Sequence, residues 1–140
     1  MGDGVGTRTV SQRLEHGANA GAVARELVLD FLADHNTTDE LRHNAALVAY
    51  ELVANAVAHG NPYDDGTVEL TCELLDDALV VRVRDAGSHG AREPRALEPE
   101  VGHGRGLAIV DALSNSWSVD RSEGTVVTAR VPLSWQRPES

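Results

Sequence analysis

Hydrophobic positions recur at helical spacing over two stretches in the first half of the chain. The first stretch, residues 21–36, predicts a helix whose buried side is formed by Val23, Leu27, Val28 and Phe31. The second stretch, residues 37–60, has the apolar stripe Leu41, Ala45, Val48, Leu52 and Ala56. Thr37 and Glu40 have the spacing of a capping box, and Gly60 is a candidate C-cap. We therefore expect two consecutive helices, the second one long.

Alternation of apolar and polar residues predicts strands on either side of a long irregular segment. Residues 67–75 and 78–85 alternate with period two, which favours an antiparallel hairpin. Its inward positions are Val68, Leu70, Cys72 and Leu74, then Leu79, Val81 and Val83. Asp85 keeps this inward parity, either as a turn residue or as a ligand-binding group at the rim of the core. Residues 7–15 and 124–133 predict two further strands.

The irregular segment, residues 86–106, holds five Gly and two Pro. Loops of that length inside a compact domain are usually functional or disordered. Helical spacing resumes after Gly106 and extends towards Trp117, which we expect to pack at the end of that helix, with contact to a partner as the alternative.

Composition narrows the class of protein. The 140 residues suit one domain, expected over residues 9–133 between flexible ends at 1–8 and 134–140. A net charge of -10 and the lack of any lysine disfavour direct binding to nucleic acid. A single cysteine, Cys72, excludes an internal disulfide and suits the core. No window reaches the ~20 apolar residues of a membrane span, and no signal peptide is visible, so we expect a cytoplasmic protein without membrane contact.

Three polar residues interrupt the apolar end of the second helix at intervals of four: Glu51, Asn55 and His59. Positions four apart lie about 40° apart around a helix axis, so these side chains share one edge. We expect a polar ligand along it. His59 either faces a phosphate or ends the helix, where an imidazolium suits the dipole. The other histidines lack metal-ligand spacing and are interpreted as loop or surface residues: His16, His35, His43, His89 and His103.

A glycine box precedes the third helix. Gly102, Gly104 and Gly106 allow backbone amides to approach phosphate oxygens, and the helix presents its positive N-terminal end to an anion. Arg105 is placed to bond a terminal phosphate. A bare flexible loop is the alternative, because the box is neither a Walker loop nor a dinucleotide fingerprint. A nucleotide would explain this box, the polar helix edge and the inward Asp85 together.

Four stretches in this order resemble the Bergerat-fold (GHKL) ATP-binding superfamily, which includes gyrase, histidine kinases and anti-sigma factor serine kinases. The family's Asn-bearing helix resembles ELVANAVAH, and its Asp-x-Gly adenine motif resembles DAGSHG. Its second glycine box is similar to GHGRGLAIV, and its closing strand to GTVVTARVPL. The resemblance implies an α/β two-layer sandwich with a mixed, mostly antiparallel sheet covered on one face by three helices.

The same resemblance implies roles for individual residues. Asn55 would ligate the Mg²⁺ that bridges the phosphates of ATP, and a single helix-borne oxygen is typical of how that ion is held. Asp85 would accept the adenine amino proton, Thr125 would bond near the same ring edge, and Gly87 would keep the base pocket open. Ser88 to His103 would form a mobile lid. The implied cofactor-binding residues are Asn55, His59, Asp85, Gly87, Gly102, His103, Gly104, Arg105, Gly106, Leu107 and Thr125.

Glu51 lies one turn before Asn55. At this position gyrase-like ATPases and anti-sigma serine kinases carry a Glu that acts as general base. Histidine kinases usually carry an Asn there. A carboxylate there can poise a hydroxyl for attack on the γ-phosphate, whereas the alternative is a solvated helix glutamate. No phosphoacceptor-histidine hairpin precedes the motifs, and the chain is too short for a transducer domain. The chain therefore resembles an anti-sigma factor serine/threonine kinase of the RsbW type.

This resemblance implies partners as well as cofactors. A sigma factor would be sequestered, an anti-anti-sigma (STAS-type) protein would be phosphorylated on a serine, and a homodimer is compatible with the resemblance. Two alternatives stay open, a catalytically silent ATP-binding partner-switch protein and a stand-alone ATPase.

Overall fold

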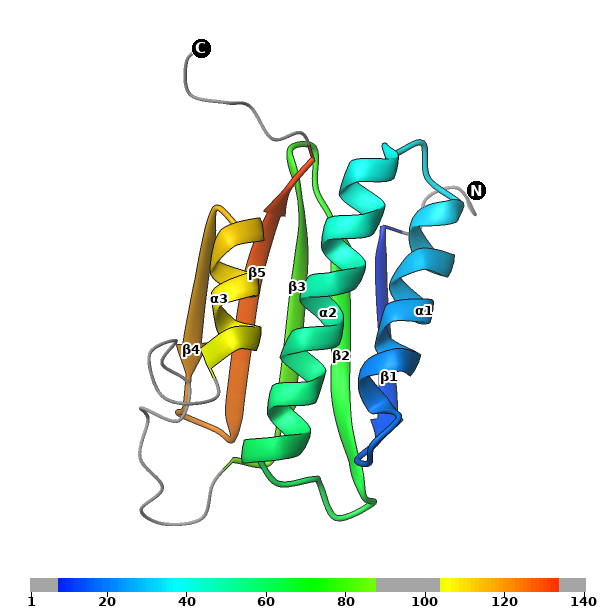
Figure 1. Cartoon of the computed structure of the whole chain (residues 1–140). Coiled ribbons are helices and arrows are strands. Elements are labelled where there is room, and N and C mark those ends of the chain that lie inside the picture. Colours follow the sequence, from blue (N-terminus) through cyan, green and yellow to red (C-terminus); the bar gives the residue numbers. More distant parts are fainter. Residues whose placement is uncertain (1–7, 88–103, 134–140) are drawn as a thin grey trace.

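A computed structural model of the chain describes residues 8–87 and 104–133, and the side chains of the second part from Leu107 onward. The elements in chain order are β1 (Thr9–Glu15), α1 (Ala20–Ala33), α2 (Asp39–His59), β2 (Thr67–Leu74), β3 (Ala78–Asp85), α3 (Gly104–Leu113), β4 (Ser116–Asp120) and β5 (Thr125–Pro132). Among these strands the order in the sheet is β1-β2-β3-β5-β4, and each pair of neighbours is antiparallel. The three helices cover one face of the sheet (Figure 1), which confirms the expected two-layer α/β sandwich.

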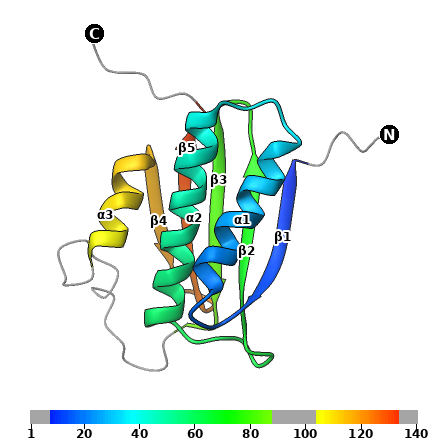
Figure 2. The same ribbon diagram turned by 45° about the vertical axis from the view of Figure 1, so that its right-hand side comes forward.

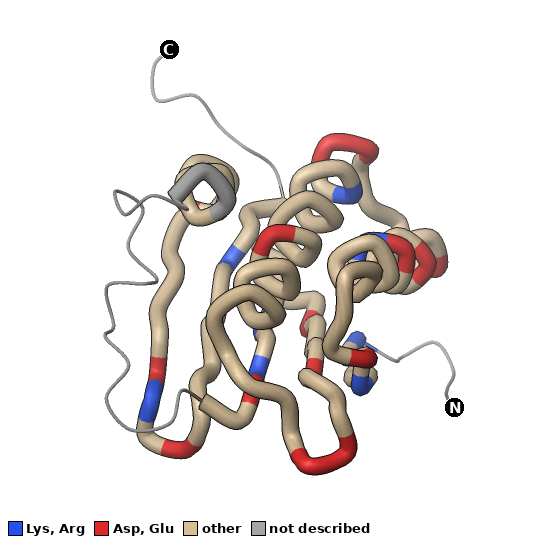
Figure 3. The backbone as a smooth tube through the Cα atoms, turned by 60° about the horizontal axis from the view of Figure 1, so that its bottom comes forward, with Lys and Arg blue, Asp and Glu red and all other residues tan. Residues whose placement is uncertain are grey.

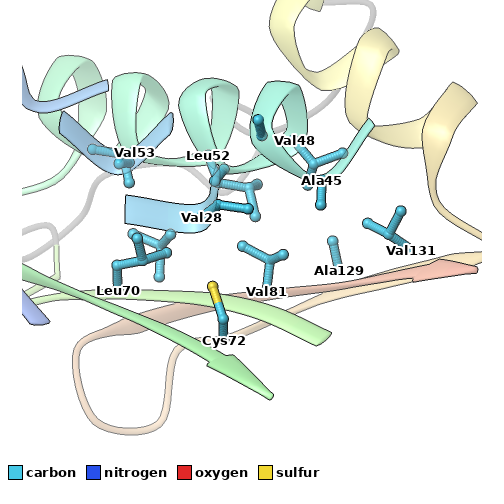
Figure 4. Packing of buried hydrophobic residues seen from close by; sticks show 14 of the residues in the cluster. Val28, Ala45, Val48, Leu52, Val53, Leu70, Cys72, Val81, Ala129 and Val131 are labelled. Carbon is cyan, nitrogen blue, oxygen red and sulfur yellow. The ribbon is translucent and has the colours of Figure 1, made fainter. Parts of the chain in front are cut away.

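The core lies between the helices and the inner face of the sheet. Val28 of α1 and Leu52 of α2 face strand residues such as Val81 (Figure 4). All the inward positions predicted for β2 and β3 are buried, because alternate side chains of a pleated strand point to the same face. Burial also raises the pKa of the Cys72 thiol to about 12, as suits the core residue predicted from the sequence.

The buried side of α1 agrees with the prediction for Val28, which is fully buried, and for Leu27 and Phe31, which pack partly buried against the core, but not for Val23. Val23 is 47% exposed, and the buried residues are Ala20, Gly21, Ala24, Val28 and Leu32. The small residues on this side let α1 approach α2 closely, since a Cβ on Gly21 would lie 3.1 Å from the ring of Tyr50. Helical spacing fits two neighbouring stripes, and the close packing of the two helices selects the one with small side chains.

The N-terminus of α2 is capped one residue later than predicted. The Oγ1 atom of Thr38 accepts a hydrogen bond of 3.0 Å from the backbone N–H of Leu41, which makes Thr38 the N-cap. Thr37 instead belongs to the turn between the helices, where its backbone N–H donates to the carbonyl of His35 at 2.9 Å. At the other end the prediction holds, because the N–H of Gly60 donates to the carbonyl of Ala56 and closes the helix.

The third helix and the residues after it also depart from the prediction. Helix α3 begins at Gly104 rather than after Gly106, and it ends at Leu113, so Trp117 lies in β4 rather than at the end of a helix. The backbone N–H of Asn115 donates to the carbonyl of Arg130, which brings the chain into the sheet as an edge strand. Trp117 is half-buried there against the core, and its Nε1 donates to the Asp111 carboxylate at 3.1 Å.

None of the helices in the described parts of the chain is both long enough and apolar enough to cross a membrane.

Candidate functional site

The predicted site residues of the described chain come from elements that meet at one end of the molecule. Helix α2 and strand β3 both end there, strand β5 begins there, and α3 points its N-terminal end in the same direction (Figures 1 and 2). The antiparallel pairing of β3 with β5 sets Asp85 directly opposite Thr125. Two residues 40 positions apart in the sequence therefore lie side by side, as adenine recognition by both would require.

The polar edge of α2 lies where the sequence places it. Glu51, Asn55 and His59 are all half-buried, beside the fully buried stripe of the same helix. Helix α2 packs against α3 as well as against the sheet. Burial raises the pKa of the Glu51 carboxyl above its ordinary value, which brings it closer to that of a general base at neutral pH.

Asp85 is a buried carboxylate at the end of a strand, only 4% exposed. Its Oδ1 atom accepts a hydrogen bond of 2.6 Å from the backbone N–H of Gly87. Burial raises the pKa of Asp85, while the Gly87 N–H and the nearby His16 act in the opposite direction. Within the described parts of the chain, no other hydrogen bond to the carboxylate is found, and its Oδ2 atom lies against Gly60.

Two glycines hold the turn that follows Asp85 against the start of β5. Gly87 and Gly124 have φ angles of 93° and 73°, in the left-handed region that favours glycine. A Cβ on Gly124 would overlap the backbone carbonyl of Asp85, and a Cβ on Gly87 would come within 3.1 Å of the Gly124 Cα. Only glycines allow the two segments to approach this closely.

Gly60 contributes to the site in a way that the sequence interpretation missed. Its φ is -102°, which any residue can adopt, so its role as a C-cap does not explain the need for glycine. A Cβ at this position would overlap the carboxylate of Asp85. The glycine therefore leaves the room that the buried carboxylate occupies.

The residue after Gly60 was also missed. The backbone carbonyl of Asn61 accepts from the N–H of Ala86 at 2.9 Å, and its side-chain Nδ2 donates to the carbonyl of Gly87 at 2.6 Å. An Asn between a helix end and a proline reads as a turn residue in the sequence, and only the fold brings it to the Asp85 turn.

His16 is closer to the site than its interpretation as a loop or surface residue implied. It follows β1, its backbone N–H donates to the carbonyl of Gly66 at 2.9 Å, and its Nε2 atom is buried without a hydrogen-bond partner. Strand β1 ends at the same end of the sheet as β3 (Figure 1), and His16 lowers the pKa of the Asp85 carboxyl electrostatically. The fold therefore brings the end of β1 to the same end of the molecule as Asp85.

Part of the predicted phosphate site lies outside the described residues. This holds for Gly102, His103 and the expected lid from Ser88 to His103, while Gly104, Arg105 and Gly106 form the first turn of α3 with side chains that are not described. Leu107, the next residue, is 2% exposed, so its side chain is packed in the interior. In the described chain, no cluster of three His, Cys, Asp or Glu side chains is placed to hold a metal ion.

Comparison with known proteins agrees with this arrangement. The family model described as the histidine kinase-like ATPase domain matches residues 11–131. The chain belongs to this family. The match covers the polar edge of α2, the Asp85 turn and the start of β5, so these features lie within the histidine kinase-like ATPase domain.

Two solved structures share the fold of this ATPase domain. The crystal structure of the RsbU and RsbW domains of Rv1364c from Mycobacterium tuberculosis matches with a TM-score of 0.69 and 22% identity, over 93% of this chain and 34% of that chain. The Acinetobacter baumannii histidine kinase AdeS matches with a TM-score of 0.50 and 18% identity, over 91% of this chain and 69% of that one. The domain thus corresponds to about a third of the Rv1364c chain. Among curated proteins no match is found.

Proposed function

We propose that this histidine kinase-like ATPase domain binds Mg-ATP and acts as an anti-sigma factor with serine/threonine kinase activity. The observation that carries the nucleotide site is the Asp85 carboxylate. One of its oxygens is occupied by Gly87, and the other can accept the adenine amino proton. Thr125, opposite Asp85 in the sheet, is placed to bond the same edge of the base. Gly87 would hold this turn open to the base.

Magnesium would be held mainly by the nucleotide. The donor set fits this role, because Asn55 offers an amide oxygen on a half-buried helix edge and no all-protein metal cluster occurs among the described residues. Mg²⁺ is usually bound through one or two protein oxygens, with phosphates and waters completing the shell. When bound, it would neutralise charge on the transferred phosphate.

The phosphates need positive groups, which are scarce on this chain. The net charge is -10, and acidic positions border this end of the molecule, including the exposed Asp64 and Asp65 in the turn after α2 (Figure 3). We therefore propose that the phosphates are bound by backbone amides of the glycine box and the start of α3, from Gly102 to Leu107. The side chains of Arg105, His59 and His103 would add further contacts.

Glu51 would act as the general base for transfer to a protein serine. It lies one helical turn from Asn55, so its carboxylate would stand beside the metal-bound phosphates, and its raised pKa suits proton abstraction from a hydroxyl. We propose a STAS-type anti-anti-sigma protein as the substrate and a sigma factor as the second partner. This partner assignment is supported by the fold shared with a structure that contains an RsbW domain. A cytoplasmic location and a homodimer belong to the same proposal.

Calorimetric titration tests the nucleotide site. We expect one Mg-dependent site for ATP or ADP on each chain, and Asn55→Ala should bind ATP with little dependence on Mg²⁺. Asn44→Ala, the same change on α2 but far from the site, serves as the matched control and should behave as the wild type. A folded wild-type protein that gives no heat with either nucleotide would end the proposal.

Transfer is tested with labelled ATP and a candidate antagonist that carries the target serine. If Glu51 is the base, Glu51→Ala should bind ATP within about threefold of the wild type yet lose most transfer, because general-base contributions run about 10² to 10⁴-fold. A wild-type protein that binds both partners without labelling the serine would indicate a silent switch. Release of phosphate without an acceptor would indicate a stand-alone ATPase.

A further inference from the structure

The Asp85 turn is held by a residue that belongs to no predicted motif. Asn61 contacts this turn twice, through its carbonyl to Ala86 N–H and through Nδ2 to the Gly87 carbonyl. The second bond joins residues 26 positions apart in the sequence and is only 2.6 Å long. It therefore links the exit of α2 to the end of β3.

The bond from Asn61 bears directly on the orientation of the Asp85 carboxylate. Gly87 donates its N–H to Asp85 Oδ1, while its carbonyl accepts from Asn61. Both backbone polar groups of Gly87 are therefore engaged, and the two bonds hold this flexible residue at its φ of 93°. If the Asn61 bond is lost, Gly87 can rotate and the carboxylate loses its fixed direction.

Asn61 is itself firmly anchored. On one side it follows Gly60, whose N–H closes α2. On the other side the turn at residues 62–66 is tied to β1, where the guanidinium of Arg13 lies 4.7 Å from the ring centre of Tyr63. Because the Asn61 side chain is short and the backbone on both sides of it is held, its hydrogen bond keeps the Asp85 turn at a fixed position relative to α2.

We propose that Asn61 is a positioning residue for base selection, which holds the Asp85 carboxylate where it meets the 6-amino group of a purine. This inference rests on the proposed ATP site. A 6-aminopurine donates to the carboxylate, whereas a 6-oxopurine presents an acceptor oxygen to it, so a fixed carboxylate discriminates between the two. Without Asn61 the carboxylate is free to turn away, and the preference for the amino purine falls.

The test compares the dissociation constants of ATP and inosine triphosphate, which differ at position 6 of the base. We expect Asn61→Ala to weaken ATP binding by about three- to tenfold, the effect of one lost hydrogen bond, while inosine triphosphate binding changes little. Asn61→Asp has the same shape but no Nδ2 donor. It should lower the ratio of ATP affinity to inosine triphosphate affinity at least as much as Asn61→Ala does. Asn44→Ala should leave both constants unchanged, and thermal melting of each variant checks that it is folded.

A double-mutant cycle separates positioning from general damage. If Asn61 acts through Asp85, adding Asn61→Ala to Asp85→Asn should not reduce the ratio of the two affinities further. The inference would be overturned if Asn61→Ala weakened the binding of both nucleotides equally. It would also be overturned if the wild type preferred ATP and Asn61→Ala left the ratio of the two affinities unchanged. Neither result would contradict the ATP site itself. A wild type that binds neither nucleotide would reject both proposals.

Discussion

At the scale of single residues, the site is organised around one buried charge. Asp85 has no cation among its hydrogen-bond partners in the described chain, and its pKa is raised mainly by burial. A buried carboxylate with so little compensation lowers the stability of the fold at neutral pH. Such a group is retained where a ligand requires it, which supports its proposed role in binding adenine.

The pH dependence of stability follows from the raised pKa of Asp85. In the unfolded chain an Asp carboxyl has a pKa of about 4, so below that pH the carboxyl is protonated in both the folded and the unfolded state. As the pH rises through the higher pKa of the folded state, the buried group must ionise and the stability that it contributed is lost. We therefore expect Asp85→Asn, which keeps an acceptor for the Gly87 N–H, to melt at a higher temperature than the wild type at neutral pH.

Melting curves between pH 4 and pH 8 check this prediction, and the advantage of Asp85→Asn should shrink as the pH falls. Asp65→Asn is the control of opposite sign, because a hydrogen bond from the Thr67 hydroxyl lowers the pKa of the exposed Asp65. That substitution should bring no gain in stability at neutral pH. A loss of stability for Asp85→Asn at every pH would contradict the argument.

Gly60 offers a second prediction at the same scale. Because a Cβ there would overlap the Asp85 carboxylate, Gly60→Ala should destabilise the protein by about 1 to 3 kcal/mol, as overpacking does, and should weaken ATP binding. A Cβ on Gly17 would meet nothing within 4 Å, so Gly17→Ala should change stability by less than about 0.5 kcal/mol. Urea unfolding of both variants measures the difference, and similar values for the two would refute the steric explanation.

At the scale of elements, α2 links the core to the site. Its buried stripe packs on the sheet, its polar edge presents the proposed catalytic and metal-binding groups, and its C-terminal exit reaches the Asp85 turn. Any shift of the helix along its axis would move all of these groups together. The ends of α2 are therefore as important to the site as its faces.

The N-cap assignment gives a prediction for this helix. Thr38→Ala removes the acceptor for the Leu41 N–H and should cost about 1 kcal/mol. Thr37→Ala removes only a partly exposed bond from Arg42 and should cost less, about 0.5 kcal/mol or below. Thermal or urea unfolding decides between them, and a larger effect at Thr37 would restore the capping box expected from the sequence.

At the scale of the whole molecule, one core joins all the described elements. Residues from α1, α2, α3 and every strand contribute to or pack against the same hydrophobic cluster. Because these contacts depend on one another, partial loss of one layer exposes the inner face of the other. A single cooperative unfolding transition is expected.

Two probes of unfolding can test this expectation. Trp117 reports on the packing of β4, and circular dichroism reports on the helices. In a Trp135→Phe variant, which leaves Trp117 as the only tryptophan, the two urea transitions should coincide. Two separate midpoints would show that the β4 edge unfolds independently and would argue against one domain over residues 9–133.

Much of the fold was predictable because its signals are local. The alternation in β2 and β3 determines which side chains face inward, and it carries Asp85 into the buried side with no information from elsewhere in the chain. The spacing of Glu51, Asn55 and His59 similarly places them on one helix edge. Each of these predictions needs only the geometry of a single element.

Other features could be decided only by contacts between elements. The choice of buried side in α1 depends on how closely it approaches α2, and the strand at Trp117 depends on pairing with β5. The need for glycine at position 60 and the bond from Asn61 to Gly87 arise because the fold brings the end of α2 against the end of β3. The periodicity of residues within one helix or strand holds no information about contacts between distant segments, so these features were visible only in the tertiary structure.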